Sequence, residues 1–345
     1  MIKRSLHFLL FLSLAAFSSK VSGVPPRVSR PFYGDDTITL SRLMQNAQPM
    51  QQMIFKKVKD TVLKVYYVKP ASAKPGKKYP AVVCIHGGGW TAGGADVFFP
   101  HARYFASRNA VGISIEYRLI KYKGPTMQDC LADCKSAMRF IRAHAAELNI
   151  DPDKIVVMGD SAGGHLAASL GTIDGFDDLA DNLKISTKPN AMVLYNPGLD
   201  MTETPHVLNI IKTQTALGKD LNANLALLTN KDILTARALS PVFHVHPNQP
   251  PVLLMHGLDD KVIFPEQSTR FADSMKMAGN QCKLILLPNT RHAFVVTKYT
   301  ATEATVVNAI TEADVFLSSL GFLHGNPTLR LSDPPAWVIK APAKK

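Results

Sequence analysis

The sequence predicts an α/β fold, in which helices cover both faces of a mostly parallel central sheet. Six short apolar runs have the unbroken hydrophobicity of strands that are buried on both faces, and segments with helical spacing of apolar residues lie between them. Strands that alternate with helices in this way form parallel βαβ units. With 46% hydrophobic and 19% charged residues, the chain has enough apolar material for the core of such a fold.

The elements are expected in the following order. Apolar and polar side chains alternate over residues 53–70 around Lys59 and Asp60, which predicts an antiparallel hairpin. The six buried strands are expected at residues 81–86, 110–118, 154–160, 191–197, 251–257 and 282–288. Helices are expected at residues 99–109, 127–148, 161–171, 265–280 and 301–321, where apolar residues recur every three or four positions.

The two ends of the chain are expected to lie outside one central domain, residues 24–325. Lys3 and Arg4 precede a short apolar run that leads to small residues before position 24, the pattern of a signal peptide over residues 1–23. The mature protein would then be secreted or periplasmic and have no membrane span, and a retained N-terminal anchor is the alternative. Residues 326–345 are rich in proline and lysine and are expected to form an extended tail.

One segment, residues 199–240, is too long for a plain connection between two strands. Its pattern is helical. Two interpretations stay open: a helical cap over a functional site, or a longer connection at the periphery.

Charge and cysteine usage limit the classes of partner. The net charge of +12 suits an acidic polymer or surface, but no basic block is interleaved with aromatic residues, so a nucleic-acid partner is not expected. The four cysteines lack the spacing of a disulfide framework and are expected to be free thiols. No further cysteine or histidine pair completes a metal site with Cys130 and Cys134, so no metal is expected.

The segment "MGDSAGGHLAASLG", residues 158–171, places Ser161 between a predicted strand and a predicted helix. Gly159 and Gly163 complete a G-x-S-x-G pattern, in which a tight turn lifts the serine hydroxyl above the sheet at a helix N-terminus. The alternative is an ordinary strand-to-helix turn with a serine N-cap. A serine in this turn becomes a nucleophile only if the chain also supplies a base, a carboxylate and donors for an oxyanion.

Each of these groups has a candidate. The glycines of "IHGGGW" follow the first buried strand, and the amide N–H groups of Gly88 and Gly89, with that of Ala162, are predicted to form the oxyanion hole. Asp259 lies three residues before Val262 in the loop after a strand and is the predicted carboxylate. Asp260 is the alternative. His292 follows the last strand and is the predicted base.

Together, "HGGGW", "GDSAGGHLA", "HGLDDKV" and "RHAF" resemble the esterases and lipases of the hormone-sensitive-lipase type, and still more the secreted, acetylxylan-esterase-like carbohydrate esterases. The similarity covers residues 53–322 and implies the α/β-hydrolase fold, whose triad has the same order along the chain. Two features depart from the family pattern. With Asp259 as the carboxylate, the acid loop is one residue shorter than the common H-G-x-x-D form, and Arg291 stands where glycine is frequent.

We therefore expect a secreted serine carboxylesterase without metal or organic cofactor. The expected substrates are short-chain esters, acetyl groups on carbohydrates above all. Trp90 is expected to contact the substrate, either by stacking on a sugar or as a wall of the acyl pocket, and plain packing is the alternative. A peptidase or amidase of the same fold is one alternative, and a non-catalytic binding protein on a hydrolase scaffold is another. The sequence predicts no oligomeric state.

Overall fold

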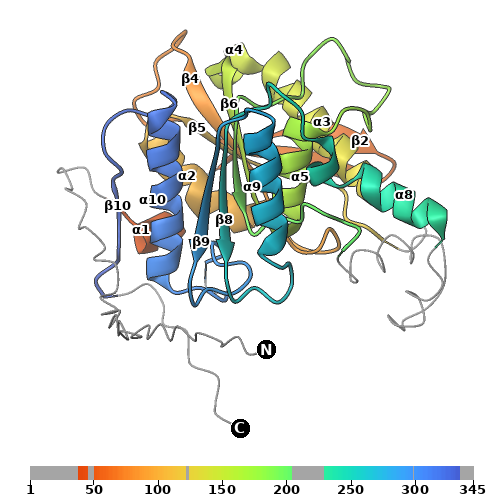
Figure 1. Cartoon of the computed structure of the whole chain (residues 1–345). Coiled ribbons are helices and arrows are strands. Elements are labelled where there is room, and N and C mark those ends of the chain that lie inside the picture. The colour runs from red at the N-terminus through yellow and green to blue at the C-terminus, as the bar shows by residue number, and fades with distance from the viewer. Residues whose placement is uncertain (1–37, 46–49, 122–123, 204–228, 298, 335–345) are drawn as a thin grey trace, which may run out of the picture. The chain divides into compact units, whose positions relative to one another are not determined.

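The computed structural model describes residues 38–45, 50–121, 124–203, 229–297 and 299–334 (Figure 1). All of them belong to one compact unit, Tyr33–Lys345. The predicted signal peptide, residues 204–228 of the predicted cap and residues 335–345 of the predicted tail lie outside the described residues. Among the residues described, no helix is both long and apolar enough to cross a membrane.

The central sheet has eight strands in the order β2-β3-β5-β4-β6-β7-β8-β9. β2 pairs antiparallel with β3, and β3 with β5, whereas the other neighbours pair in parallel. The predicted hairpin and all six predicted strands are present, and five of the six are buried as predicted, whereas the last one, at the edge of the sheet, is only partly buried. The bounds are β2 (Gln51–Val58), β3 (Thr61–Val68), β4 (Tyr79–Ile85), β5 (Val111–Ile115), β6 (Ile150–Asp160), β7 (Ala191–Tyr195), β8 (Val252–Gly257) and β9 (Cys282–Leu287).

The predicted helices are present, with one division. The helix expected at residues 127–148 splits at His144, which leaves the helical conformation. The bounds are α1 (Leu40–Met44), α2 (Phe99–Ser107), α3 (Met127–Ala143), α4 (Ala145–Leu148), α5 (Ser161–Thr172), α8 (Asn230–Ala238), α9 (Glu266–Met277) and α10 (Glu303–Ser319), with short 3₁₀ turns η1 (Ala95–Phe98) and η2 (Pro241–His244).

The first part of the predicted tail is paired rather than free. β10 (Leu329–Arg330) lies parallel to β1 (Ile38–Thr39), and the two form a small separate sheet.

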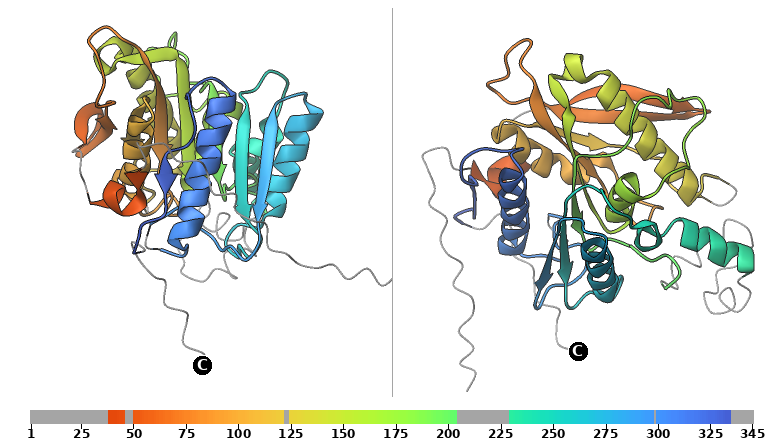
Figure 2. Two further views of the ribbon diagram at one scale, coloured as in Figure 1. Left: turned by 90° about the vertical axis from the view of Figure 1, so that its left-hand side faces the viewer. Right: turned by 45° about the horizontal axis from the view of Figure 1, so that its top comes forward.

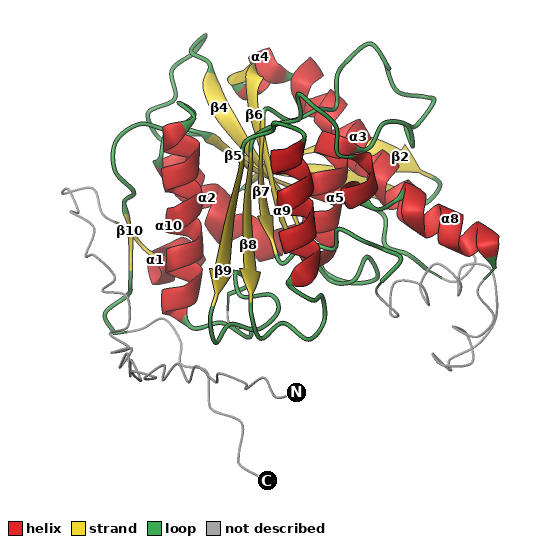
Figure 3. Ribbon diagram, in the orientation of Figure 1, coloured by secondary structure: helices red, strands yellow, loops and turns green. Residues whose placement is uncertain are grey.

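Side chains of the sheet alternate between two apolar layers, as the two-residue period of a strand requires. In β4, Val83 and Ile85 face a core formed with α3, α5 and α9, whereas Val82 and Cys84 face a core formed with α2 and α10. Figure 3 shows the strands between these two groups of helices, and in the left panel of Figure 2 α10 lies in front of the sheet. Burial on both faces explains why the strands read as continuous apolar runs.

All four cysteines are free thiols, as expected. Cys84, Cys130 and Cys134 are buried, and Cys282 is half-buried. Burial raises the pKa of the Cys282 thiol to about 11. The fold is therefore held by packing and hydrogen bonding, and not by cross-links among these cysteines.

A buried ionic cluster ties the C-terminal helix α10 to α2. The carboxylate of Asp314 is fully buried, accepts a hydrogen bond from Tyr104 Oη, and lies 2.7 Å from Arg108 Nε. Arg108 also donates to the backbone oxygens of His324 and Gly325, each at 3.0 Å. The guanidinium thus joins the end of α2 to the segment that follows α10.

The substitution Asp314→Asn is expected to lower the free energy of unfolding by about 3–5 kcal/mol, because it leaves the buried Arg108 without a counter-charge. Urea denaturation measures the change. The control is Asp273→Asn, at an exposed position of α9, where a change within about 0.5 kcal/mol is expected. Equal effects of the two substitutions would contradict the role given to the cluster.

Candidate active site

Ser161 occupies a strained turn at the centre of the sheet's carboxyl edge. It follows β6 directly and begins α5, and its φ of 52° lies in the left-handed region that non-glycine residues rarely adopt. Strain of this kind persists only where the surrounding structure enforces it. The conformation is that of the predicted nucleophile elbow.

Two glycines make the turn possible. A Cβ atom on Gly159 would lie 2.3 Å from the backbone oxygen of Gly163, and one on Gly163 would lie 2.1 Å from the backbone oxygen of Ile85. Backbone atoms cannot give way as a flexible side chain can. The G-x-S-x-G pattern is therefore a steric requirement for packing the start of α5 against β4 and β6.

His292, the predicted base, is the residue whose side chain faces Ser161. Its Nε2 atom lies 2.8 Å from Ser161 Oγ, and its Nδ1 atom lies 2.6 Å from Asp260 Oδ2. A carboxylate oxygen only accepts hydrogen bonds, so Nδ1 carries the hydrogen and Nε2 has a free lone pair toward the hydroxyl. This tautomer is the one that can take a proton from Ser161.

The prediction of Asp259 as the carboxylate is wrong, and the alternative, Asp260, occupies the position. Asp259 is exposed, whereas Asp260 is 1% exposed and contacts His292. The amide of Asp260 donates to the oxygen of Gly257, so residues 257–260 form a turn that directs the fourth residue inward. With Asp260 as the carboxylate, the spacing from His256 is H-G-x-x-D, and the acid loop has the common length.

The Asp260 carboxylate is surrounded by donors. Oδ1 accepts from the amides of Val262 and Ile263 at 2.8 and 3.0 Å, and Oδ2 lies 3.2 Å from His256 Nε2 as well as 2.6 Å from His292. Burial would raise the pKa of this carboxyl, but the hydrogen bonds from His256 and His292 hold it well below its usual range. Asp260 is therefore a carboxylate at neutral pH.

The loop after β4 carries the predicted oxyanion donors. No hydrogen bond within the described part of the chain uses the amide of Gly88 or Gly89, and both glycines line the pocket in front of Ser161. Ala162 lies in the first turn of α5, where amides have no carbonyl one turn earlier to bond. Free donors from the glycine loop and the helix start thus flank the serine.

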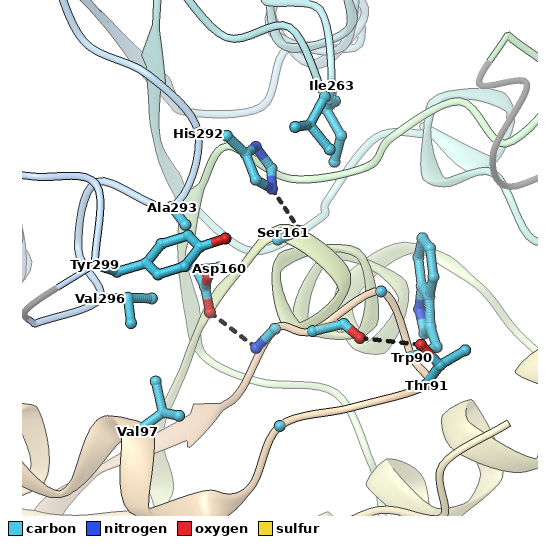
Figure 4. A pocket seen from close by; sticks show the side chains of 15 residues that line it. Trp90, Thr91, Val97, Asp160, Ser161, Ile263, His292, Ala293, Val296 and Tyr299 are labelled. Carbon is cyan, nitrogen blue, oxygen red and sulfur yellow. Dashed lines mark hydrogen bonds between the residues drawn. The ribbon is translucent and has the colours of Figure 1, made fainter. Parts of the chain in front are cut away.

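Asp160 holds this loop in place, a role that the sequence analysis did not assign. Its buried Oδ1 accepts from the amide of Gly87 at 2.9 Å (Figure 4). Burial raises the pKa of the Asp160 carboxyl to about 6, and the hydrogen bond from Gly87 opposes that shift. The residue before the nucleophile thereby fixes the position of the oxyanion loop.

A pocket of about 480 Å³ opens over the serine. Figure 4 shows Trp90 and Thr91 on one side of Ser161, and Ala293, Val296, Tyr299 and Val97 on the other. Besides the glycines of residues 87–89, Gly93, Asp160, Ser161 and His292, the pocket is lined by Trp90, Thr91, Val97, Val262, Ile263, Ala293, Val296 and Tyr299. Among the residues that the structure describes, the lining is therefore mostly apolar and includes no lysine or arginine.

Trp90 lines the pocket, as its predicted role requires, and its indole is fixed. The Nε1–H group donates to His165 Nδ1 at 3.1 Å, and His165 Nε2 donates in turn to the oxygen of Leu239 at 2.7 Å. Both rings are buried. The indole presents a rigid apolar wall to the pocket, because its polar atom is already used.

Three non-glycine residues with strained backbone line this pocket. Trp90 and Ala293 adopt positive φ angles, both of 59°, and Ser161 does so at 52°. Each of the three lines the pocket. Val97, Val296 and Tyr299 also line the pocket. No sequence motif indicates them, since they come from η1 and from the loop after His292.

A family model named BD-FAE matches residues 65–275, which is more than half of the chain. Esterase 2 of Thermogutta terrifontis has a similar structure. Its apo form superposes with a TM-score of 0.68 at 34% identity, over 80% of this chain and 97% of that chain. Other structures of that esterase hold propionate or butyrate, or are phosphorylated by paraoxon.

Two of the curated relatives with similar sequences are also esterases by name. Esterase LipQ of Mycobacterium tuberculosis is 27% identical over 275 residues, or 76% of this chain and 61% of LipQ. An acetylxylan esterase of Xylanibacter ruminicola is 26% identical over 218 residues, or 62% of this chain and 41% of that enzyme. The chain thus spans about two fifths to three fifths of the length of these curated relatives.

The raised pKa of Asp160 makes stability depend on pH. A carboxyl that holds its proton more tightly in the folded state than in the unfolded state loses stability as the pH rises from about 4 to about 6. Asp160→Asn keeps an acceptor for Gly87 and removes the titration. Relative to the parent, its free energy of unfolding should rise by up to about 3 kcal/mol between pH 4 and pH 7. Urea unfolding across this range measures the difference, and a constant difference would contradict the assignment.

Proposed function

Since the chain belongs to the BD-FAE family of α/β-hydrolases, we propose that it is a serine carboxylesterase. The observation that carries the proposal is the continuous hydrogen-bonded series from Asp260 through His292 to Ser161 Oγ. The names of the relatives support it, as do the free amides beside the serine. A non-catalytic scaffold has no need of a strained serine with a correctly oriented base.

In the proposed reaction, Ser161 Oγ attacks the ester carbonyl and forms a bond to its carbon. His292 Nε2 takes the hydroxyl proton, and Asp260 stabilises the resulting imidazolium. The amides of Gly88, Gly89 and Ala162 stabilise the oxyanion, which collapses to an acyl-enzyme as His292 returns the proton to the leaving alcohol. Water, deprotonated by His292, then releases the acid and restores the serine.

We propose short, uncharged acyl groups as the preferred acids. The described side chains that line the pocket are apolar apart from Thr91, Asp160, Ser161, His292 and Tyr299. The related esterase 2 accommodates propionate and butyrate, which have three and four carbons. A peptidase or amidase activity has no comparable support, since the named relatives reported above are esterases.

For the alcohol part of the ester we propose a carbohydrate hydroxyl, so that the substrate is an acetylated carbohydrate. A second hollow of about 520 Å³ lies next to the pocket over Ser161. Asp96 and Thr297 line this second hollow, whereas their neighbours in the chain, Val97 and Val296, line the pocket over Ser161. Tyr66 and Phe99 lie in this hollow with ring centroids 5.3 Å apart, close to Arg103. Aromatic faces with polar groups at their edge suit a sugar ring. The name of one relative, an acetylxylan esterase, also supports a carbohydrate as the alcohol.

We also propose that the protein is exported, because residues 1–23 have the pattern of a signal peptide. The amino-terminal residue of the exported protein is expected to be Val24.

The triad is tested by three variants with p-nitrophenyl acetate as substrate. Ser161→Ala and Asp260→Asn are expected to lower kcat by about 10⁴-fold or more, because they remove the nucleophile and the group that fixes the base tautomer. Asp259→Asn is the matched control and should retain kcat within about twofold. Paraoxon is expected to place its phosphoryl group on Ser161 of the parent protein, as mass spectrometry can show. Full activity of Ser161→Ala would refute the proposed function.

The carbohydrate proposal is tested by Phe99→Ala. We expect KM for an acetylated xylo-oligosaccharide to rise about two- to tenfold, the equivalent of one aromatic contact, with no change toward p-nitrophenyl acetate. Phe243→Ala, at an exposed phenylalanine that lines neither hollow, is the control. An equal loss with both substrates would show that Phe99 supports the fold rather than the sugar.

A further inference from the structure

His256 lies directly behind the triad carboxylate. It is the second-to-last residue of β8, and its side chain is fully buried. Its Nδ1 atom lies 2.7 Å from Ser268 Oγ in α9, and its Nε2 atom lies 2.9 Å from the backbone oxygen of Ile263 and 3.2 Å from Asp260 Oδ2. From the sequence alone, His256 is interpreted as a structural part of the turn at the end of a strand.

The position of its hydrogen follows from its neighbours. Nε2 faces a carbonyl oxygen and a carboxylate oxygen, and both of these only accept hydrogen bonds. Nε2 therefore carries a hydrogen that Ile263 and Asp260 share. Ser268 holds the other side of the ring, so the direction of this donor is fixed from both ends.

Asp260 Oδ2 is thus shared by two histidines on opposite sides. His292 donates to it at 2.6 Å from the loop after β9, and His256 donates at 3.2 Å from β8. Oδ1 is held separately by the amides of Val262 and Ile263. Within the described chain, His256 and His292 are the ionisable side chains that bond this carboxylate. Any rotation of the carboxylate away from His292 would break the bond to His256.

From this geometry we propose that His256, held by Ser268, is a positioning residue that orients Asp260 toward His292 and limits the negative charge that His292 meets. The inference rests on the proposed esterase function and adds a second histidine to its machinery. A plain packing role does not require Nε2 to point at Oδ2, and an apolar side chain of similar size would fill the same space. The hydrogen bond is what the proposal makes functional.

The experiment compares His256→Gln with His256→Leu. Glutamine can place an N–H donor close to the position of Nε2, whereas leucine keeps most of the volume and donates nothing. We expect leucine to lower kcat for p-nitrophenyl acetate by about 10- to 100-fold with KM within about twofold, the range found for residues that orient a functional ligand. His256→Gln should keep most of the kcat of the parent protein.

The pH profile separates positioning from packing. Without the donor from His256, the carboxylate stabilises the imidazolium of His292 more strongly, so the acidic limb of kcat/KM should move to higher pH in His256→Leu and stay near the parent in His256→Gln. A general loosening of the fold would lower activity without this shift. Equal kcat values and equal profiles for the two variants would overturn the inference.

Ser268→Ala covers the case in which His256→Leu does not fold. It leaves His256 in place but frees one side of the ring. We expect kcat to fall about two- to fivefold, and the acidic limb of kcat/KM to move to higher pH by less than in His256→Leu. An unchanged kcat together with an unchanged pH profile in Ser268→Ala would contradict the proposal. Failure of the esterase function itself is distinguishable, because it would leave the parent without activity.

Discussion

The arrangement of the site depends on one steric constraint, the approach of α5 to the ends of β4 and β6 without intervening side chains. Gly163 brings the first turn of the helix against the backbone of Ile85 and His86, and Gly159 brings the strand end against Gly163. A larger residue at either position would push the helix away from the sheet. Ser161 would then lose its left-handed conformation, and the helix start would move away from the glycine loop that follows β4.

A second constraint joins the two loops that complete the site. Gly257, at the end of β8, has room for no side chain, because a Cβ atom there would lie 2.2 Å from the oxygen of Thr290. The amide of Asp259 donates to that same oxygen at 3.0 Å, and the amide of Leu258 donates to Leu287 at 2.9 Å. The acid loop and the histidine loop are therefore held together by their backbones, and Asp260 and His292 meet as a result.

Much of this arrangement could be predicted because it follows from local chemistry. The strands of the parallel sheet can be predicted because their sequences are unbroken apolar runs. The nucleophile elbow can be predicted because no other residue can replace its glycines. The choice between Asp259 and Asp260 could not be made in this way. The two carboxyls are adjacent in the chain, and only the turn at residues 257–260 decides which of them faces inward.

Other parts of the site depend on contacts between distant segments. The bond from Asp160 to Gly87 joins residues 73 positions apart, and Val97 meets Val296 only because η1 and the histidine loop lie on the same side of the pocket. Neither pairing leaves a periodic pattern or a motif in the sequence. The sequence predicts the reacting groups well, but it predicts the walls around them poorly.

The left-handed conformations of Trp90, Ser161 and Ala293 have a consequence for the heat resistance of the molecule. Each of these residues would relax to an ordinary backbone conformation if its surroundings loosened, whereas the strands beneath them have no such tendency. Thermal inactivation should therefore begin below the melting temperature of the sheet, and rigidifying the core alone would do little to delay it.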